Sequence, residues 1–289
     1  MKRGKVILSY AGQYHVFAHG STYVLRPRGV IKFKAKDVVA GDEVLFDEKT
    51  LTIEKILPRT NFIRRPRVSN IEQMIIVSSS VEPELSPHLI YKTLTYALMH
   101  EVKPVVVISK IDKLKNHDEL LAFQKQLAKI NLPVLLYSAK TKEGLEKIED
   151  LLKNKVSLLI GQTGVGKSSL INLLDPNFNR TIGEYSKALG RGKHQTKDVY
   201  FLKYKEGFVV DSPGFSSLEL KIYKEDLAQF FPGFEQAIGK CFFRDCQHLN
   251  EKDCEVKKLI KQNIIAKEAY LIYQKLHDEL QYKWRRFEK

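Results

Sequence analysis

The chain has 289 residues, 43% of them hydrophobic, which is enough for one large domain or for two to three smaller ones. Its longest apolar runs are too short to span a bilayer, and polar residues interrupt the basic start before a signal peptide could form. A membrane or secreted protein is therefore disfavoured, and a cytoplasmic protein is expected. The formal net charge is +14, and Lys and Arg outnumber Asp and Glu by 14 to 6 in residues 1–67 and by 9 to 5 in residues 255–289. Positive potential in both segments predicts nucleic acid as a partner, and a merely lysine-rich solvated surface is the alternative.

The first segment, residues 1–67, is typical of a small β domain. Runs in which hydrophobic and polar residues alternate are separated by turns that contain Gly or Asp, at 4–18, 21–27, 42–47 and 51–58. This spacing predicts a five-stranded barrel of the oligonucleotide-binding type (an OB-fold), whose open face often carries RNA. The basic stretch RRPR at 64–67 indicates a linker after the barrel.

From residue 68 to 221 the pattern changes to alternating strands and helices. Strands are expected at 71–80, 104–110, 132–140, 156–162 and 207–214, with helices at 86–100, 117–130, 143–153 and 167–174. This alternation predicts a mostly parallel α/β sheet that binds its ligand at the carboxyl ends of the strands. Residues 222–289 then indicate a mainly helical domain, whose last helix, roughly 262–287, is long and basic with Trp284 near its end.

The stretch GQTGVGKS at 161–168 fits the phosphate-loop pattern G-x-x-x-x-G-K-[ST] completely and lies between a predicted strand and a predicted helix. Glycines let such a loop turn its backbone N–H groups inward, and the start of the helix adds a favourable dipole. We expect Lys167 to act catalytically at the β- and γ-phosphates and the Ser168 hydroxyl to bind Mg²⁺. The residues expected to hold the phosphates are Gly161, Gln162, Thr163, Gly164, Val165, Gly166, Lys167, Ser168 and Ser169. A glycine-rich turn that binds nothing is the alternative.

A second element, DSPG at 211–214, follows the apolar run GFVV. Asp211 at the end of a strand can hold Mg²⁺ through water, and the Gly214 N–H can meet the γ-phosphate. Alone, the D-x-x-G pattern more often marks a turn. Here the pattern indicates a nucleotide site because it follows the phosphate loop and lies at the end of a buried strand.

The stretch SKID at 109–112 also follows a buried run and resembles the N-K-x-D element of GTPases. In that element the Asp carboxylate accepts two hydrogen bonds from guanine that adenine does not offer, each worth about 1.5–3 kcal/mol because the acceptor is charged. Asp112 is therefore expected to read the base, with the aliphatic stem of Lys110 lying over it. Ser109 replaces the usual Asn, so one amide tether, and some affinity with it, is expected to be lost.

The stretch SAK at 138–140 ends the next predicted strand and resembles the S-A-K element that backs the guanine. The residues expected to hold the base are thus Ser109, Lys110, Asp112, Ser138, Ala139 and Lys140. In ordinary small GTPases the phosphate loop comes first, whereas here the base-reading elements precede it. The chain therefore looks like a circularly permuted GTPase, which is feasible because domain termini often lie close together.

The stretch ALGRGKHQTKD at 188–198, between the phosphate loop and DSPG, holds the candidate switch residues. We expect Thr196 to bring its hydroxyl and carbonyl groups to Mg²⁺ and the γ-phosphate. Phe215 stands where Ras-like proteins place the Gln that orients the attacking water, and an apolar side chain cannot do this, so His194 is the candidate catalytic residue. A basic surface loop with an exposed histidine is the alternative.

All three cysteines of the chain lie within one short segment, in the pattern Cys241-x4-Cys246-x-His248-x5-Cys254. In a cytoplasmic chain such a cluster indicates a metal rather than disulfides. Three thiolates and one imidazole suit a tetrahedral structural Zn²⁺, which would help to fold a segment with little core of its own. Reduced core cysteines near a surface histidine are the alternative.

Taken together, the permuted order, GQTGVGKSSL, GRGKH, DSPGF and the cysteine pattern resemble the ribosome small subunit-dependent GTPase A (RsgA) family over essentially the whole chain. The resemblance implies an OB-fold RNA-binding domain, a permuted GTPase domain and a zinc-binding helical domain, which we place at 1–67, 68–221 and 222–289. It also implies a monomer that binds the 30S ribosomal subunit and its 16S rRNA, hydrolyses GTP to GDP when the subunit stimulates it, and acts in late maturation of that subunit. Gln195 stands where the family usually has Thr, which favours Thr196 as the switch residue.

The permuted order also suggests how the nucleotide controls binding, because the chain passes from DSPGF into the cysteine cluster within a short segment. We hypothesise that GTP fixes the zinc and OB domains in a subunit-binding arrangement and that hydrolysis releases it. Two other functions stay open. One is an RNA-binding nucleotide switch with negligible turnover; the other is an ATP-dependent nucleotide kinase, against which SKID, SAK and the lack of a lid count.

Overall fold

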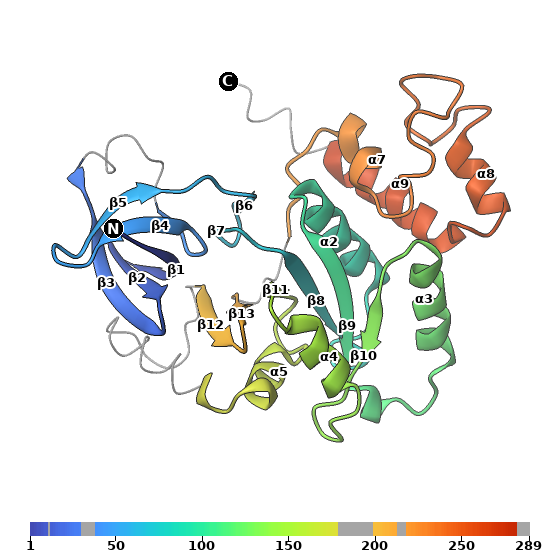
Figure 1. Cartoon of the computed structure of the whole chain (residues 1–289). Coiled ribbons are helices and arrows are strands. Elements are labelled where there is room, and N and C mark those ends of the chain that lie inside the picture. The colour runs from blue at the N-terminus through green and yellow to red at the C-terminus, as the bar shows by residue number, and fades with distance from the viewer. Residues whose placement is uncertain (11, 30–37, 179–198, 213–217, 282–289) are drawn as a thin grey trace. The chain divides into compact units, whose positions relative to one another are not determined.

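The structure is a computed structural model of the chain and describes residues 1–10, 12–29, 38–178, 199–212 and 218–281 (Figure 1). The chain divides into two compact units. The first contains residues 1–75, 145–160 and 167–214, and the second contains residues 76–144, 161–166 and 215–289. Each unit is therefore assembled from segments that are far apart in the sequence.

The first unit begins with a closed five-stranded barrel, as predicted. Its strands are β1 (Lys2–Tyr10), β2 (Gln13–Ala18), β3 (Ser21–Pro27), β4 (Glu43–Asp47) and β5 (Thr52–Ile56), in the order β1-β2-β3-β5-β4. β4 pairs with β1 to close the barrel, and β3 runs parallel to β5. This is the five-stranded Greek-key arrangement of OB-folds. The predicted run 4–18 is two strands, because Gly12 adopts a φ of 78° that turns the chain.

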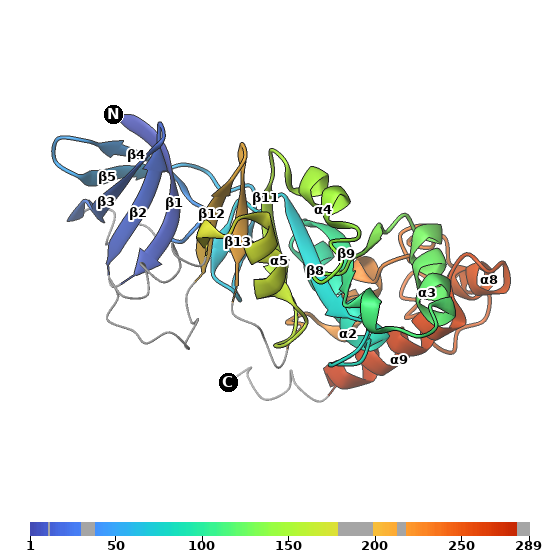
Figure 2. The same cartoon turned by 90° about the horizontal axis from the view of Figure 1, so that it is seen from below.

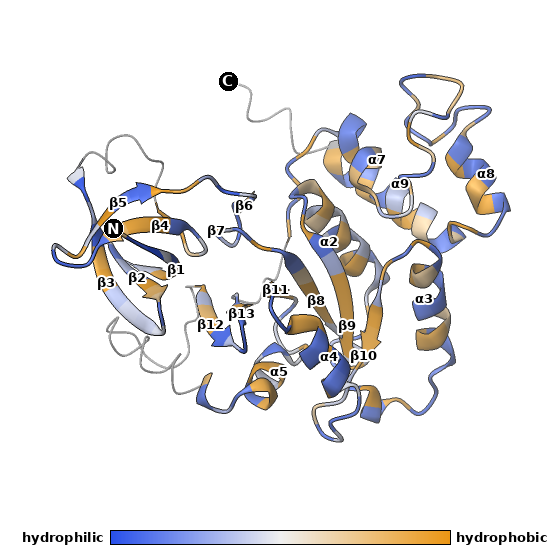
Figure 3. Cartoon of the chain, in the orientation of Figure 1, coloured by the Kyte–Doolittle hydropathy of each residue, from blue (hydrophilic) through white to orange (hydrophobic). Residues whose placement is uncertain are grey.

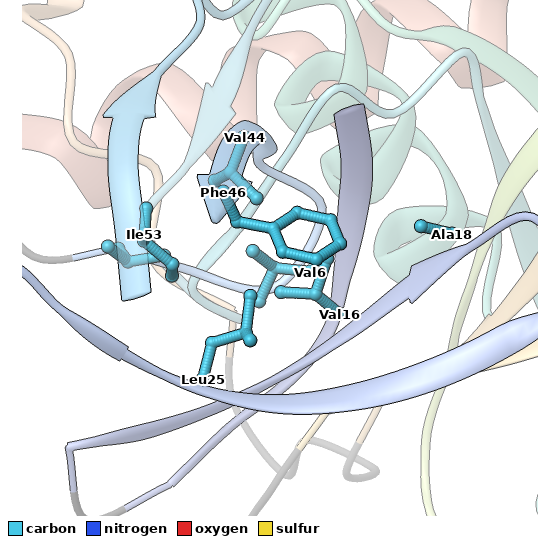
Figure 4. Close-up of a cluster of buried hydrophobic side chains, with 8 residues drawn as sticks. Val6, Val16, Ala18, Leu25, Val44, Phe46 and Ile53 are labelled. Carbon is cyan, nitrogen blue, oxygen red and sulfur yellow. The ribbon is translucent and has the colours of Figure 1, made fainter. Parts of the chain in front are cut away.

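The core of the barrel consists of the inward-facing residues of these strands and of Val38, which lies between β3 and β4 (Figure 4). The buried side chains are Val6, Val16, Ala18, Leu25, Val38, Val44, Phe46 and Ile53. Within β4, Val44 and Phe46 are buried while the residues between and beside them are half-buried, which is the two-residue period of a strand that has one face in a core. Burial of each such side chain stabilises the barrel by about 1.5–3 kcal/mol.

A buried carboxylate ties the barrel to the segment that follows it. Asp42 is 0% exposed, and its two oxygens accept hydrogen bonds from Arg59 Nε (2.6 Å) and Nη2 (2.8 Å). The Ser69 hydroxyl donates a third bond of 2.6 Å, and the Val39 N–H donates a fourth of 2.9 Å. Ser69 lies in the short hairpin of β6 (Phe62–Ile63) and β7 (Val68–Ser69). We name Asp42, Arg59 and Ser69 the Asp42 clasp.

The remaining strands form a six-stranded sheet in the order β10-β9-β8-β11-β13-β12. In the first unit, β11 (Val156–Ile160) runs parallel to β13 (Gly207–Asp211), and β12 (Tyr200–Tyr204) pairs antiparallel with β13. Helices α4 (Leu145–Leu152) and α5 (Lys167–Leu174) belong to the same unit. β12 was not among the predicted strands, and it lies at one edge of the sheet.

The second unit contains the other half of this sheet. β8 (Gln73–Ser79) begins in the first unit and ends in the second, and β9 (Lys103–Ser109) runs parallel to β10 (Val134–Leu136). Their largely hydrophobic sequences are visible in Figure 3. Helices α2 (Pro87–Met99) and α3 (Asp118–Lys129) follow β8 and the short helix η1 (Ile111–Lys113). The predicted α/β alternation is confirmed here.

The second unit also includes the C-terminal helices, which are η2 (Lys224–Asp226), α7 (Leu227–Phe230), α8 (Glu255–Lys261) and α9 (Lys267–Gln281). α9 runs along α2, where Lys92 Nζ lies 2.8 Å from Glu279 Oε2 (Figures 1 and 2). The predicted helix over 262–287 is wrong at its start: Asn263 has a φ of 59°, which ends α8 and separates it from α9. Trp284 lies outside the described residues. None of the helices in the described ranges combines the length and the hydrophobicity that crossing a bilayer requires.

Candidate nucleotide site and metal centre

The phosphate loop, residues 161–166, joins the end of β11 to the start of α5. A Cβ atom on Gly161 would lie 2.2 Å from the carbonyl oxygen of Val77, so no side chain fits at this position. Gly166 has a φ of 94°, in the left-handed region that side chains disfavour. Val165 is buried and anchors the loop, while Thr163 and Gly164 are exposed, as are Ser168 and Ser169 in the first turn of α5. This loop therefore has the backbone shape that the glycine pattern predicts.

The predicted base-reading loop contacts the phosphate loop directly. Ser109, at the end of β9, is buried, and its hydroxyl donates a 2.6 Å hydrogen bond to the carbonyl oxygen of Val165. A tether from this position was expected to be lost when Ser replaced Asn. The hydroxyl makes one instead, because the two loops approach closely enough for a short side chain to span them.

Lys110 is held by a loop that the sequence did not single out, residues 79–84 after β8. Its Nζ donates to the carbonyl oxygen of Glu82, and its own carbonyl oxygen accepts a 2.9 Å bond from the Ser80 hydroxyl. The Glu82 carboxylate also pairs with Lys113 Nζ at 2.7 Å. These bonds fix the path of the SKID backbone. The available signal was the polar stretch SSSVEPE directly after a buried strand, at the edge where the other loops were expected.

Asp112 and Ser138 come together as the two predicted base-reading elements require. The Ser138 hydroxyl donates a 2.6 Å bond to Asp112 Oδ1 and accepts weaker bonds from the N–H groups of Lys140 (3.2 Å) and Thr141 (3.1 Å). The bond from Ser138 lowers the pKa of Asp112, so its exposed carboxylate is ionised at neutral pH. Ala139 is half-buried beside it. An oriented carboxylate of this kind can accept the two donors of a guanine edge.

Lys167 and Asp211 form a buried pair of opposite charges in the first unit. Burial raises the pKa of Asp211 to about 6, although the Lys167 charge opposes this shift. Burial likewise lowers the pKa of Lys167, and Asp211 counteracts it. Burial thus disfavours the charged form of each group. Phosphates beside Lys167 and a divalent cation beside Asp211 would stabilise these charged forms. Next to them, the Ser212 hydroxyl donates a 2.7 Å bond to the Leu159 carbonyl oxygen and holds the end of β13 against β11.

Three of the predicted site residues lie outside the described residues: His194, Thr196 and Gly214. Their assignments to water activation, Mg²⁺ and the γ-phosphate stay predictions.

The predicted metal ligands converge in the second unit. The Nδ1 atom of His248 lies 3.5 Å from Cys241 Sγ, 3.5 Å from Cys246 Sγ and 3.4 Å from Cys254 Sγ. All four ligand atoms lie within 4.8 Å of one another. Tetrahedral Zn²⁺ with ordinary Zn–S and Zn–N bonds requires Sγ-to-N separations of roughly 3.5 Å. The Cys₃His cluster therefore fits Zn²⁺, with Nδ1 as the imidazole ligand.

The groups around the cluster also favour a bound cation. Burial and the neighbouring thiols raise the pKa of Cys246 and Cys254, so three thiolates need a positive charge among them. Burial lowers the pKa of His248, which keeps its imidazole neutral as a ligand must be. The Glu251 carboxylate accepts bonds from the N–H groups of Gln247 (2.8 Å) and Leu249 (2.7 Å) and fixes the backbone on both sides of His248. Sequence reasoning missed Glu251, because its partners are backbone groups.

Comparisons with known proteins agree with this geometry. Residues 56–221 match the family model described as RsgA GTPase. The small ribosomal subunit biogenesis GTPase RsgA 2 of Oceanobacillus iheyensis is 38% identical over 288 residues, which cover 97% of this chain and 98% of the relative. The small ribosomal subunit biogenesis GTPase RsgA of Caldanaerobacter subterraneus subsp. tengcongensis is 38% identical over 98% of this chain and 97% of its own.

Solved structures give the same result. The crystal structure of YjeQ from Thermotoga maritima has a TM-score of 0.82 and 32% identity, over 98% of this chain and 99% of its own. That of YloQ, described as a circularly permuted GTPase, has a TM-score of 0.82 and 29% identity, over 97% of this chain and 95% of its own. With a family model that matches more than half of the chain, and relatives above 30% identity over nearly its whole length, this chain belongs to the RsgA GTPase family.

Proposed function

We propose that this chain binds GTP and hydrolyses it to GDP and phosphate as an assembly factor of the small ribosomal subunit. The observation that carries the proposal is the hydrogen bond from Ser109 to Val165, which joins the guanine-reading loop to the phosphate loop. Because of this bond, we assign two elements to one nucleotide site. They are the phosphate loop and Asp112, which reads guanine and is held by Ser138. Its relatives named small ribosomal subunit biogenesis GTPases support the biological role.

In this proposal, the residues predicted to contact the γ-phosphate, the attacking water and the metal ions have the following chemical roles. Lys167 neutralises the β- and γ-phosphates, while Ser168, Thr196 and, through water, Asp211 hold Mg²⁺. The Gly214 N–H contacts the γ-phosphate, and His194 orients the attacking water in place of the Gln of Ras-like proteins. The Cys₃His cluster holds one Zn²⁺ in a structural role, since four protein ligands leave no open position.

The partner in this proposal is the 30S subunit with its 16S rRNA, and the protein acts as a cytoplasmic monomer in late maturation. The supporting features are the OB-type barrel and the excess of Lys and Arg in residues 1–67 and 255–289. We keep the domain boundaries at 1–67, 68–221 and 222–289 as part of the proposal. Because phosphate contacts release counterions, subunit binding should weaken steeply with salt.

The deciding experiment measures phosphate release from GTP and from ATP, with and without purified 30S subunits. We expect hydrolysis of GTP but not of ATP, and a large stimulation by the subunits. GTP binding without turnover under either condition would support the RNA-binding nucleotide switch instead, and ATP-dependent phosphate transfer would support a kinase.

The proposal that GTP sets the subunit-binding arrangement has its own test. Affinity for 30S subunits is compared in the presence of GDP and of a non-hydrolysable GTP analogue. We expect tighter binding with the analogue, and equal affinities would contradict the switch while leaving the GTPase activity in place.

A further inference from the structure

Ser80, the first residue after β8, holds the backbone of the predicted base-reading loop at two successive positions. Its N–H donates a 3.0 Å hydrogen bond to the carbonyl oxygen of Ser109, and its hydroxyl donates one of 2.9 Å to the carbonyl oxygen of Lys110. Ser80 is only 9% exposed, and all three residues belong to the second unit. A single buried residue therefore fixes the point at which the chain leaves β9.

The backbone that Ser80 holds is strained. Lys110 has a φ of 60° and a ψ of 30°, in the left-handed region that is unfavourable for every residue with a Cβ atom. Such a conformation persists only where the surrounding structure enforces it, and it is most common at functional sites. The carbonyl oxygen of Lys110 accepts the bond from Ser80 and a second one of 3.0 Å from the Lys113 N–H. These two bonds therefore maintain the strain in the loop that carries Asp112.

The loop after β8 also holds the side chain of Lys110, because the Nζ atom donates to the carbonyl oxygen of Glu82. The Ser79 hydroxyl donates a 2.6 Å bond to the Pro83 carbonyl oxygen and closes this loop on itself. A Cβ atom on Gly164 of the phosphate loop would lie 3.8 Å from Pro83 Cδ, so the loop also lies against the phosphate loop. Both ends of the Lys110 side chain are thus fixed: the backbone at one end and the amino group at the other.

We propose that Ser80 is a positioning residue for the nucleotide base and that it acts through Lys110. By holding Lys110 in its left-handed conformation before the nucleotide binds, Ser80 directs the aliphatic stem to the place where it covers the base. The proposal rests on the proposed function, in which Lys110 and Asp112 contact the base. Ser80 contributes to affinity for the base and not to affinity for the phosphates, because the hydroxyl bonds to the base-reading loop.

The test uses the zinc-loaded protein and calorimetric titration with the Mg²⁺ complexes of GDP, ADP and inorganic pyrophosphate. Ser80→Ala removes the hydroxyl but keeps the N–H that bonds to Ser109. Lys110 then relaxes in the free protein, and GDP must restore the left-handed conformation when it binds. We expect the affinity for GDP to fall about 5- to 30-fold, the factor that corresponds to the cost of this conformation. The affinity for pyrophosphate, which reports the phosphate loop alone, should not change.

Ser78→Ala is the matched control. It removes a hydroxyl from β8, two residues before Ser80, and this hydroxyl forms no hydrogen bond with the described residues. The control should bind GDP, ADP and pyrophosphate as the wild type does, and the melting temperatures of all variants show that they are folded.

A double-mutant cycle with Lys110→Gly tests whether Ser80 acts through Lys110. Glycine adopts the left-handed conformation without cost, so adding Ser80→Ala to Lys110→Gly should lower the affinity for GDP little further. An equal loss in both backgrounds would overturn the proposal. Unchanged affinity for GDP in Ser80→Ala, or a parallel loss of affinity for pyrophosphate, would overturn it as well. A wild type that binds ADP as tightly as GDP would instead contradict the proposed function, while the comparison of the Ser80 variants would still decide the role of Ser80.

Discussion

The hydroxyl of Ser109 donates a hydrogen bond of 2.6 Å to the carbonyl oxygen of Val165, and both residues are buried. Ser109 belongs to the loop that we propose reads the base, and Val165 belongs to the loop that we propose wraps the phosphates. Because the bond is buried, it holds the two loops at a fixed separation, which a bound nucleotide must span.

Replacing Ser109 with Ala should lower the free energy of unfolding by about 1–2 kcal/mol, since a buried carbonyl is left unpaired. It should also weaken binding of GTP and of GDP by a similar factor, because the two loops are no longer held at a fixed separation. Ser109→Asn should retain most of the affinity, because an amide also donates. Equilibrium titration with fluorescent GDP and GTP analogues measures both variants, and their melting temperatures control for folding. If Ser109→Ala binds both nucleotides with wild-type affinity, the bond does not position the two loops for nucleotide binding.

Asp112→Asn should lower GTP affinity by at least about tenfold, because the amide offers one acceptor where the charged carboxylate offers two. The same amide can donate to the 2-oxo group of xanthine, so affinity for xanthosine triphosphate should rise. Competition among GTP, xanthosine triphosphate and ATP measures the change. If the variant kept the guanine preference of the wild type, another residue would have to read the base.

The pH dependence of Mg²⁺·GTP binding should report Asp211. Its pKa is raised to about 6 by burial, so its proton competes with the cation below that pH, and affinity should fall as the pH drops from 7.5 to 5. Without nucleotide, the stability of the folded protein should change with pH in the opposite direction to the affinity. The raised pKa means that the folded form binds the Asp211 proton more tightly than the unfolded form does, so stability should fall as the pH rises from about 4 to about 6.

Asp211→Asn is the matched control for this titration. It should bind Mg²⁺·GTP weakly at every pH and lack the step near pH 6, while the titration of the nucleotide itself remains in both proteins. Binding is measured at fixed Mg²⁺ across the pH range. A wild-type curve that parallels that of the variant would assign the step to another group.

Cys254→Ser should remove bound zinc and lower the stability of the C-terminal helices by several kcal/mol, because structural Zn²⁺ contributes on the order of 10 kcal/mol to small zinc domains. Cys254 is 2% exposed, directly before α8. Zinc analysis and hydrogen exchange over 231–261 measure the effect. A chelator should reproduce the loss of protection in the wild type and add little in the variant; an unchanged exchange pattern would mean that the cluster folds without metal.

His194→Ala should reduce the rate of GTP hydrolysis by about 100-fold or more with little change in GTP affinity, as expected for a residue that orients water in the transition state. His19→Asn, an exposed histidine of the barrel, is the control. Single-turnover phosphate release with 30S subunits gives the rate. Hydrolysis at the wild-type rate would remove His194 from the mechanism.

The residues that depend on local pattern were predictable from the sequence. The phosphate loop, its flanking strand and helix, the barrel strands and the four cysteine-cluster ligands follow from spacing alone, because glycine geometry, strand alternation and ligand chemistry act over a few residues. Asp112 and Ser138, the pair that we propose reads the base, also lie together, because each follows one of two neighbouring parallel strands.

Features that depend on distances in the folded chain were not predictable. The hydrogen bond from Ser109 to Val165 forms only because two loops 56 residues apart in sequence approach each other. The bond from Lys110 to Glu82 likewise joins two loops that are 28 residues apart in sequence. β12 was missed because a five-residue edge strand gives little pattern. The last helix was extended too far back, since the left-handed backbone at Asn263 leaves no strong mark in the sequence.

The Asp42 clasp has a consequence for how the barrel behaves when it is separated from the rest of the protein. A fragment that stopped after β5 would keep the carboxylate of Asp42 in the protein interior but would lose its guanidinium and hydroxyl partners. An unpaired anion in such a place is strongly destabilising, by about 3–5 kcal/mol. The barrel should therefore fold as an independent piece only when the chain extends through the hairpin that carries Ser69, which makes that hairpin part of the barrel's folding unit rather than a passive connection.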